Sequence, residues 1–258
     1  MRRRSRPLVL IAAAALGLSA LPAGTAGIRH VSEYDISLGL LPIAKASFAS
    51  EFDSSDYTIA GSFRSYGLVS LFSKISAATN VSGSVQGQKL QANAYSLVYT
   101  QGKKTRTYDV AYKNGNVVSS TIKPEPTSRP SSWIPIGDGD LQAVLDPLSG
   151  LIFPDGVKIC PSRLPIYDGE SRLDLVLSSK GSKAFSTNGY KGDAIVCEVR
   201  YEPKSGYKQG RTDIEFLKKA KMEVWFAKAA GVNVYAPVYA RIPTRVGDVY
   251  VTAVKYGG

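Results

Sequence analysis

Cysteine, histidine and methionine are scarce in this sequence of 258 residues. It contains two cysteines, one histidine and two methionines. Two Cys and one His fall short of the four ligands of a usual zinc site, so neither a metal ion nor a cofactor is expected. The one histidine, His30, lies close to the N-terminus, where chains are commonly frayed. We therefore expect no Ser-His-Asp or Cys-His catalytic set.

Loops that bind phosphate or calcium are also missing. The stretch Gly137-Asp138-Gly139-Asp140 lacks the lysine and the spacing of a phosphate loop, and it lacks the acidic ladder of a calcium loop. Asp138 and Asp140 are the residue type that a glycosidase uses. Any chain with 21 acidic residues contains such pairs, however, so we assign no catalytic residue.

A long apolar run occurs only at the N-terminus. Four arginines precede a run from Leu8 to about Leu21, and the small residues Gly24 and Ala26 follow it. This order is typical of a cleavable secretory signal. The run of about fourteen residues is shorter than the roughly twenty of a membrane helix, although an uncleaved anchor remains the alternative. We predict a signal peptide over residues 1–26 and one β-rich periplasmic domain over residues 27–258.

The composition also limits the compartment and the partners. No cysteine lies near the expected cleavage site, so no lipid anchor is expected; the periplasm is the first prediction and the medium the second. The net charge is +11, or about +7 without the arginines of the leader. A diffuse positive charge favours anionic lipid headgroups or cell-wall polymers, and ordinary solvated faces are the alternative. Nucleic acid is not an expected partner outside the cytoplasm.

The two cysteines are Cys160 and Cys197. An even number of cysteines in an oxidising compartment is typical of a disulfide. The bond would close a loop of 38 residues, for which chain entropy predicts a stabilisation of about 4 kcal/mol. Two free, buried thiols are the alternative.

Many short segments alternate between apolar and polar residues, which is typical of strands. Segment 106–113 alternates, Asn114-Gly115 follows as a type I′ turn, and Val117 to Ile122 form the returning strand. Pro237 interrupts a later segment, which predicts an edge or a bulge there. The other alternating segments are 172–177, 195–201, 222–226, 232–242 and 249–256.

Two short helices are predicted beside these strands. One covers Leu68 to Ala78, and the other lies between Asp138 and Phe153, where Asp146-Pro147 resembles a helix start. Segment 123–135 is rich in Pro and Ser and is interpreted as a connection within one domain, with a domain linker as the alternative. The fold class is mainly β: a single large curled antiparallel sheet, a half-barrel or β-spiral, with the two helices against its concave side.

Three motifs resemble a known family. They are Tyr34 to Ala46 with a glycine turn, Leu145-Asp146-Pro147-Leu148-Ser149, and Asp168-Gly169 before Arg172. The sequence resembles domain-of-unknown-function family 3108, a set of exported proteobacterial proteins. The resemblance implies an architecture similar to the curled sheet of periplasmic lipoprotein carriers. It implies no agreed biochemical function, because fold alone does not determine function.

Tyrosines provide the candidate binding residues. Facing a cavity, they would form an amphipathic wall for an acyl chain or a peptide, whereas cross-strand packing is the ordinary alternative. We predict a non-enzymatic periplasmic binding or scaffold protein for a lipid, a lipoprotein or another envelope component. A carboxylate enzyme acting on cell-wall polymers and a structural protein using a sheet edge are the alternatives. The six tyrosines are Tyr95, Tyr99, Tyr108, Tyr112, Tyr235 and Tyr239.

Overall fold

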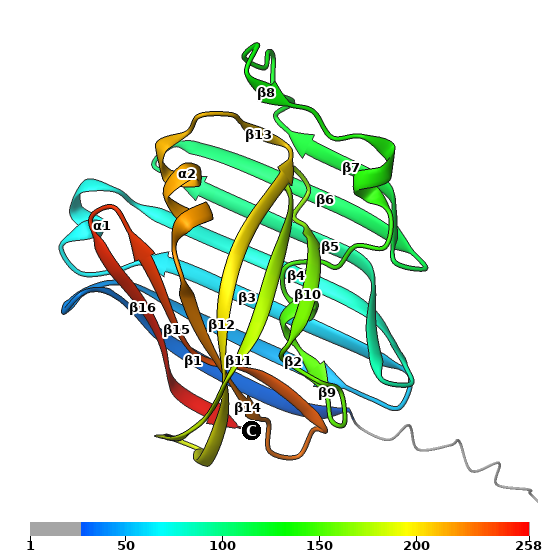
Figure 1. Ribbon diagram of the computed structural model, residues 1–258, viewed down its shortest axis with the longest axis vertical. Helices are drawn as coiled ribbons and strands as arrows, with labels where there is room; N and C mark the ends of the chain where they lie inside the picture. Colours follow the sequence, from blue (N-terminus) through cyan, green and yellow to red (C-terminus); the bar gives the residue numbers. More distant parts are fainter. Residues whose placement is uncertain (1–26, 258) are drawn as a thin grey trace, which may run out of the picture.

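One antiparallel sheet of 14 strands contains most of the regular structure (Figure 1). This computed structural model describes residues 27–257, so the predicted signal peptide lies outside the described residues. The curled antiparallel sheet expected from the alternating segments is confirmed. The first half of the chain provides β1 (Ile28–Leu38), β2 (Leu41–Phe52), β3 (Asp56–Ser65), β4 (Ile75–Gln86), β5 (Lys89–Gln101), β6 (Lys104–Lys113) and β7 (Asn116–Lys123).

The second half of the chain extends the sheet from the other side of β1. The strand order is β10-β11-β12-β14-β15-β16-β1 and then β2 to β7, so the last strand of the chain pairs with the first. β9 pairs with β15 outside this path, and β8 pairs with β13 as a separate ribbon. The strands are β8 (Trp133–Ile134), β9 (Phe153–Pro154), β10 (Ser162–Tyr167), β11 (Arg172–Thr187), β12 (Tyr190–Ser205), β13 (Tyr207–Lys208), β14 (Met222–Lys228), β15 (Val234–Thr244) and β16 (Gly247–Gly257).

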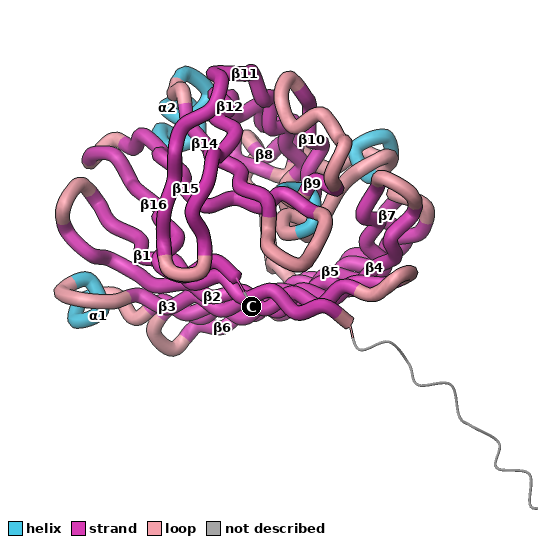
Figure 2. The backbone as a smooth tube through the Cα atoms, turned by 90° about the horizontal axis from the view of Figure 1, so that it is seen from below, coloured by secondary structure: helices cyan, strands magenta, loops and turns pink. Residues whose placement is uncertain are grey.

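The sheet curls into two layers that face each other. Figure 2 shows β1 to β6 as a lower layer, with β11, β12 and β14 to β16 above it. Alternation along each strand gives the layers a shared apolar interior. Ile59, Val81 and Val110 from the lower layer and Val238 and Tyr256 from the upper one belong to the same buried cluster.

A second buried cluster joins β10, β11, β12 and β14 of the upper layer to β9 and the residues that follow it. It contains Leu177, Val199 and Phe226, and it includes both cysteines. Cys160 and Cys197 form the predicted disulfide, with their Cα atoms 6.2 Å apart. The bond joins the irregular segment before β10 to the middle of β12. It therefore attaches that segment to the sheet.

Loss of the disulfide is expected to destabilise the protein strongly. Cys197→Ser removes the crosslink and places a hydroxyl at a fully buried position, so the free energy of unfolding falls by about 4 kcal/mol or more. Urea unfolding measures this loss. The double variant Cys160→Ala/Cys197→Ala separates the crosslink from the hydroxyl. Unchanged stability of the double variant contradicts the prediction.

The predicted hairpin and the predicted bulge are both confirmed. Asn114 and Gly115 have φ values of 53° and 75°, as a type I′ turn requires, and they connect β6 to β7. The register between β14 and β15 shifts between Trp225 and Phe226, opposite Pro237. The Pro237 carbonyl accepts a hydrogen bond of 2.6 Å from the Tyr34 hydroxyl of β1. The proline therefore lies in a central strand, where the bulge accommodates its missing N–H.

The helix predicted over Leu68 to Ala78 is wrong. Only Val69–Phe72 forms a helical turn, α1, and β4 begins at Ile75. The spacing of apolar residues fits a helix, but Leu68 and Leu71 are exposed. Strand β4 pairs with both β3 and β5, so its backbone N–H and C=O groups find hydrogen-bond partners on two sides. A short isolated helix would leave its terminal groups unpaired and would also bear the cost of nucleation.

The second predicted helix is replaced by two 3-10 turns, η1 (Asp138–Leu141) and η2 (Ser149–Leu151). Asp146 is not the N-cap of η2, which is Leu148, but its Oδ1 fixes the turn before η2 by accepting from the backbone N–H groups of Leu148 and Ser149 at 2.9 Å each. Between the turns, Val144 donates to Gly115 and Leu145 donates to Pro165. This segment therefore connects the hairpin turn before edge strand β7 to the other edge, β10.

The longest helix among residues 27–257, α2 (Thr212–Lys219), was not predicted. Asp213 and Glu215 lie in its first turn and Lys218 in its last, which complements the helix dipole. Its Ile214 is buried, and the helix contacts β12 and β15. No helix within residues 27–257 has both the length and the hydropathy needed to cross a bilayer.

Candidate ligand site

A hollow of about 580 Å³ opens at one end of the two layers. The volume lies within the range of small-molecule sites. Half of its lining residues are apolar, and the remaining ones are short, polar or glycine. The lining residues are Ile28, Phe52, Asp53, Ser54, Val85, Gly87, Gln88, Leu90, Pro154, Asp155, Gly231, Val232, Asn233 and Val234.

The lower layer contributes two hairpin turns and the start of β1. The β2–β3 turn is fixed by Asp53, whose Oδ1 accepts from the backbone N–H groups of Ser55 at 2.8 Å and Asp56 at 2.6 Å. These two hydrogen bonds lower the pKa of the Asp53 carboxyl. The carboxylate is thus ionised and engaged with its own turn.

The upper layer contributes β9 and the β14–β15 loop. β9 pairs with the start of β15, and the backbone N–H of Asp155 donates to the Asn233 carbonyl at 2.8 Å. The Lys228 ammonium lies 2.5 Å from the Asp155 carboxylate and lowers the pKa of that carboxyl. Both carboxylates that line the hollow are therefore satisfied by neighbouring groups.

The floor of the hollow is apolar. Phe52, Leu90, Val232 and Val234 are each at most 9% exposed and belong to the buried cluster between the layers. Phe52 stacks on Tyr57, with ring centroids 6.1 Å apart. The hollow is thus an opening onto the core, with polar groups only at its rim, and its chemistry suits an apolar chain with a polar end.

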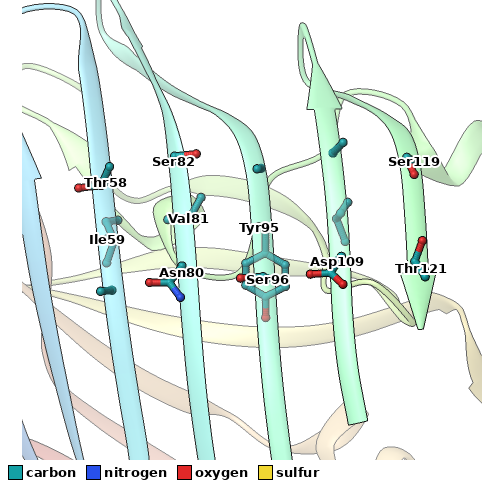
Figure 3. Close-up of a pocket in the computed structure, with 14 residues that line it drawn as sticks. Thr58, Ile59, Asn80, Val81, Ser82, Tyr95, Ser96, Asp109, Ser119 and Thr121 are labelled. Carbon is teal, nitrogen blue, oxygen red and sulfur yellow. The ribbon is translucent and has the colours of Figure 1, made fainter. Parts of the chain in front are cut away.

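A second hollow, of about 480 Å³, lies on the outward face of β3 to β7 (Figure 3). Short side chains form it in two cross-strand rows, and Asp109 is its one charged residue among those described. The two valines, the isoleucine and the tyrosine behind it belong to the core. One row is Thr58, Ser82, Ala94, Ala111 and Ser119, and the other is Ala60, Asn80, Ser96, Asp109 and Thr121.

The outward hollow lacks the apolar walls that a lipid chain requires. Its side chains carry hydroxyl, amide, carboxylate and methyl groups on a surface that is open to solvent. We therefore take the hollow between the layers as the candidate site.

Four of the six predicted tyrosines share the inner face of β5 and β6. Tyr95 and Tyr112 are each 5% exposed, and the Tyr112 hydroxyl donates to the Tyr167 carbonyl at 3.0 Å. Tyr108 reaches Glu170 at 3.3 Å, and Tyr99 is half-buried on the same face. Tyr95 and Tyr112 thus take part in cross-strand packing, the alternative that the sequence left open.

The other two tyrosines lie on β15, away from these four. Tyr235 packs beside the disulfide cluster, opposite Phe153 of β9. The ring of Tyr239 lies 4.7 Å from that of Trp225. None of the six tyrosines lines the hollow between the layers. Alternation of apolar and polar residues identified strand faces that carry tyrosines. The hollow is built mainly from turns, and turns have no repeating residue pattern that a sequence search could detect.

A buried polar cluster was not predicted as such. Asp146 is fully buried, its carboxylate binds the Ser149 hydroxyl, and burial raises its pKa. Tyr57 is 2% exposed, and its hydroxyl has no hydrogen-bond partner among the described residues. Burial raises the pKa of Tyr57, and the Asp146 charge raises it further. The cluster lies inside the core, where it fixes η2.

His30 corrects another expectation. It is not frayed: it lies in β1, pairs with Ser50 of β2 and is 4% exposed. Its ring meets that of Tyr256 edge-on, with centroids 4.5 Å apart. Neither ring nitrogen has a hydrogen-bond partner among the described residues, and burial lowers the pKa of the imidazole. His30 is therefore a neutral core residue.

Acid is expected to destabilise the fold through His30. Because the folded-state pKa lies below the ordinary 6.5, the unfolded chain binds the proton first as the pH falls. The free energy of unfolding then decreases below pH 6.5, with a limiting slope of about 1.4 kcal/mol per pH unit, until the folded pKa is reached. Urea unfolding between pH 7.5 and 5 measures this decrease. In His30→Phe the same decrease should be smaller, and equal slopes in both proteins contradict the assignment.

Comparisons with known proteins give a family match and a solved structure of similar fold. The family described as "Protein of unknown function (DUF3108)" matches residues 33–254. A β-barrel-like protein of domain of unknown function DUF1849 from Brucella abortus is similar over 90% of this chain and 98% of its own, with 11% identity and a TM-score of 0.52. A "putative lipoprotein" from Parabacteroides distasonis covers 90% of this chain and 95% of its own, at 10% identity and a TM-score of 0.31. No curated protein matches the sequence.

Proposed function

We propose a function from the premise that the chain belongs to the DUF3108 family of unknown function. In this proposal it is a non-enzymatic periplasmic protein that holds an apolar chain, such as the acyl or peptide part of a lipoprotein, between its two layers. The observation that carries the proposal is the hollow of about 580 Å³ with its floor of Phe52, Leu90, Val232 and Val234.

The compartment is part of the proposal. The basic and apolar leader over residues 1–26 supports export, and the disulfide between Cys160 and Cys197 supports an oxidising destination. The proposed periplasmic protein would take up a lipid or lipoprotein ligand from another envelope component.

The state of the carboxylates supports binding over catalysis. A glycosidase needs one carboxylic acid whose pKa is raised, so that it can protonate the leaving group. In the hollow, turn hydrogen bonds lower the pKa of Asp53 and the Lys228 ammonium lowers that of Asp155. Burial raises the pKa of Asp146 and of Asp168, but neither residue lines the hollow.

A charge placed in the mouth of the hollow is expected to weaken ligand binding. Val85 lines the hollow and is half-buried against the core cluster, so Val85→Glu introduces a carboxylate there, and thermal melting checks that the variant remains folded. An apolar chain would then displace the water around an unpaired charge, and we expect its affinity to fall at least about tenfold. Displacement of a fluorescent fatty acid measures the affinity, and native mass spectrometry of the purified protein identifies a bound lipid.

Val118→Glu is the matched control, because Val118 is 62% exposed on β7 and lies outside the hollow. This variant should bind the fatty acid like the wild type. Equal affinity in all three proteins, or no bound lipid in any preparation, contradicts the proposal. Incubation with purified peptidoglycan tests the enzyme alternative, which new reducing ends or released peptides would favour.

A further inference from the structure

Large apolar side chains are exposed together at the end of the sheet opposite the hollow. Leu40 is 101% exposed, Val246 79%, Leu71 74% and Leu68 62%. Tyr66 and Leu41 are exposed beside them. These six residues are here called the tip surface. They come from the turns β1–β2, β3–β4 and β15–β16, and none is needed for the core.

Backbone hydrogen bonds hold the three turns side by side. Gly39, next to Leu40, donates to the Asp248 carbonyl at 2.9 Å, which joins the β1–β2 turn to the β15–β16 turn. Tyr66 donates to the Ile43 carbonyl at 2.8 Å, which joins the β3–β4 connection to β2. The β1–β2 turn and α1 lie at the left edge in Figures 1 and 2, so the two views agree.

Cations surround the tip surface. Arg64, Lys74, Lys103, Lys104 and Arg245 are exposed at this end, and none forms an ion pair with a described residue. The β5–β6 turn that carries the two adjacent lysines lies beside the β3–β4 connection, since the N–H of its glycine donates to the Lys74 carbonyl at 2.9 Å.

The acidic residues at this end are neutralised by partners of their own. Asp35 lies 2.9 Å from Lys45, and Asp248 lies 3.2 Å from Arg241. The start of α2 is also near, because Arg245 donates to Thr212 at 3.1 Å. Its acids are paired as well, Asp213 with Arg211 and Glu215 with Lys218. The end of the sheet therefore presents a net positive charge around an apolar centre.

We propose that the tip surface docks on an anionic phospholipid bilayer, with Leu40, Leu68, Leu71 and Val246 entering the headgroup boundary. Apolar side chains on projecting turns, ringed by unpaired cations, match an interface that is apolar beneath a layer of negative headgroups. A protein partner would instead favour an apolar patch with buried, shape-complementary side chains. This inference does not depend on the ligand proposed for the hollow.

Insertion of the tip surface is tested at a single position. Leu71→Trp places an indole on the β3–β4 connection, and Val118→Trp places one at an exposed site on β7, distant from the tip surface. With vesicles that contain phosphatidylglycerol and brominated lipid, the indole added by Leu71→Trp should be quenched and the one added by Val118→Trp should not. Subtraction of the wild-type signal removes Trp133 and Trp225. Because the readout is local, membrane binding by residues 1–26 does not reproduce it.

The affinity for vesicles gives a second measurement. Leu40→Ser/Leu71→Ser should lower vesicle affinity by about tenfold or more, because two leucines lose their transfer into the interface. Val118→Ser/Val254→Ser, which changes two exposed valines elsewhere, should leave it unchanged. Lys103→Glu/Lys104→Glu should weaken binding to phosphatidylglycerol vesicles and leave the weak binding to neutral vesicles unaltered.

Two results overturn the proposal. One is equal quenching, or no quenching, of the indoles added at positions 71 and 118. The other is a concentration-dependent dimer that Leu40→Ser/Leu71→Ser abolishes without any change in vesicle binding, which would assign the tip surface to a second copy of the chain. Thermal melting of each variant confirms that it remains folded, since the substituted tip residues are exposed. Failure of fatty-acid binding at the hollow would leave both readouts unchanged.

Discussion

The pairing of the first strand with the last determines the whole architecture. β1 pairs with β16 over eight residue pairs, from Val31 opposite Gly257 to Leu38 opposite Val249. On either side of this pair, nearly every other neighbour in the sheet is also a close neighbour in sequence. The β1–β16 ladder therefore joins two local sheets into one. The Tyr34 hydroxyl adds a bond to Pro237 of β15 across this join.

Because these residues lie far apart in sequence, their contact is the costliest to form during folding. Burial on the inner face compensates for that cost: Tyr34, Ala253 and Tyr256 are each at most 7% exposed. Burial raises the pKa of Tyr34 to about 12, so its hydroxyl stays protonated and donates at all ordinary pH values. His30 lies beside the same ladder, and its imidazole ring packs against the ring of Tyr256. This packing offsets the cost of burying two ring nitrogens that have no hydrogen-bond partner among the described residues.

Sequence reasoning found the features that depend on neighbours in the chain. Alternation located the strands, Asn114-Gly115 located a turn, and Cys160 and Cys197 located the crosslink. It failed where a tertiary contact outweighs local preference. The apolar spacing from Leu68 to Ile75 favours a helix, but only Val69–Phe72 is helical, and from Ile75 onward the chain is strand β4, paired with β3 and β5.

The candidate site could not be predicted from local sequence patterns, because distant segments form it. Its walls come from the β2–β3, β4–β5 and β14–β15 turns and from β9, segments separated by up to about 180 positions, whose proximity follows from the strand order alone. Candidate tyrosines were predicted on strands because strands show a repeating pattern of apolar and polar residues. Two of these tyrosines, Tyr95 and Tyr112, are packed in the core. Helix α2 carried a signal, acidic residues at its start and lysines at its end, that an alternation search does not detect.

In an antiparallel sheet, consecutive turns alternate between its two ends. The turns that line the hollow and the turns that carry Leu40, Leu71 and Val246 are thus separated by single strands of 10 to 12 residues. At about 3.3 Å per residue, that spacing is roughly 35 Å. The two ends share no side chain, so each can change its chemistry without disturbing the other. A molecule resting on a lipid surface by one end would hold its opening upright and away from that surface, accessible to whatever approaches from the aqueous side.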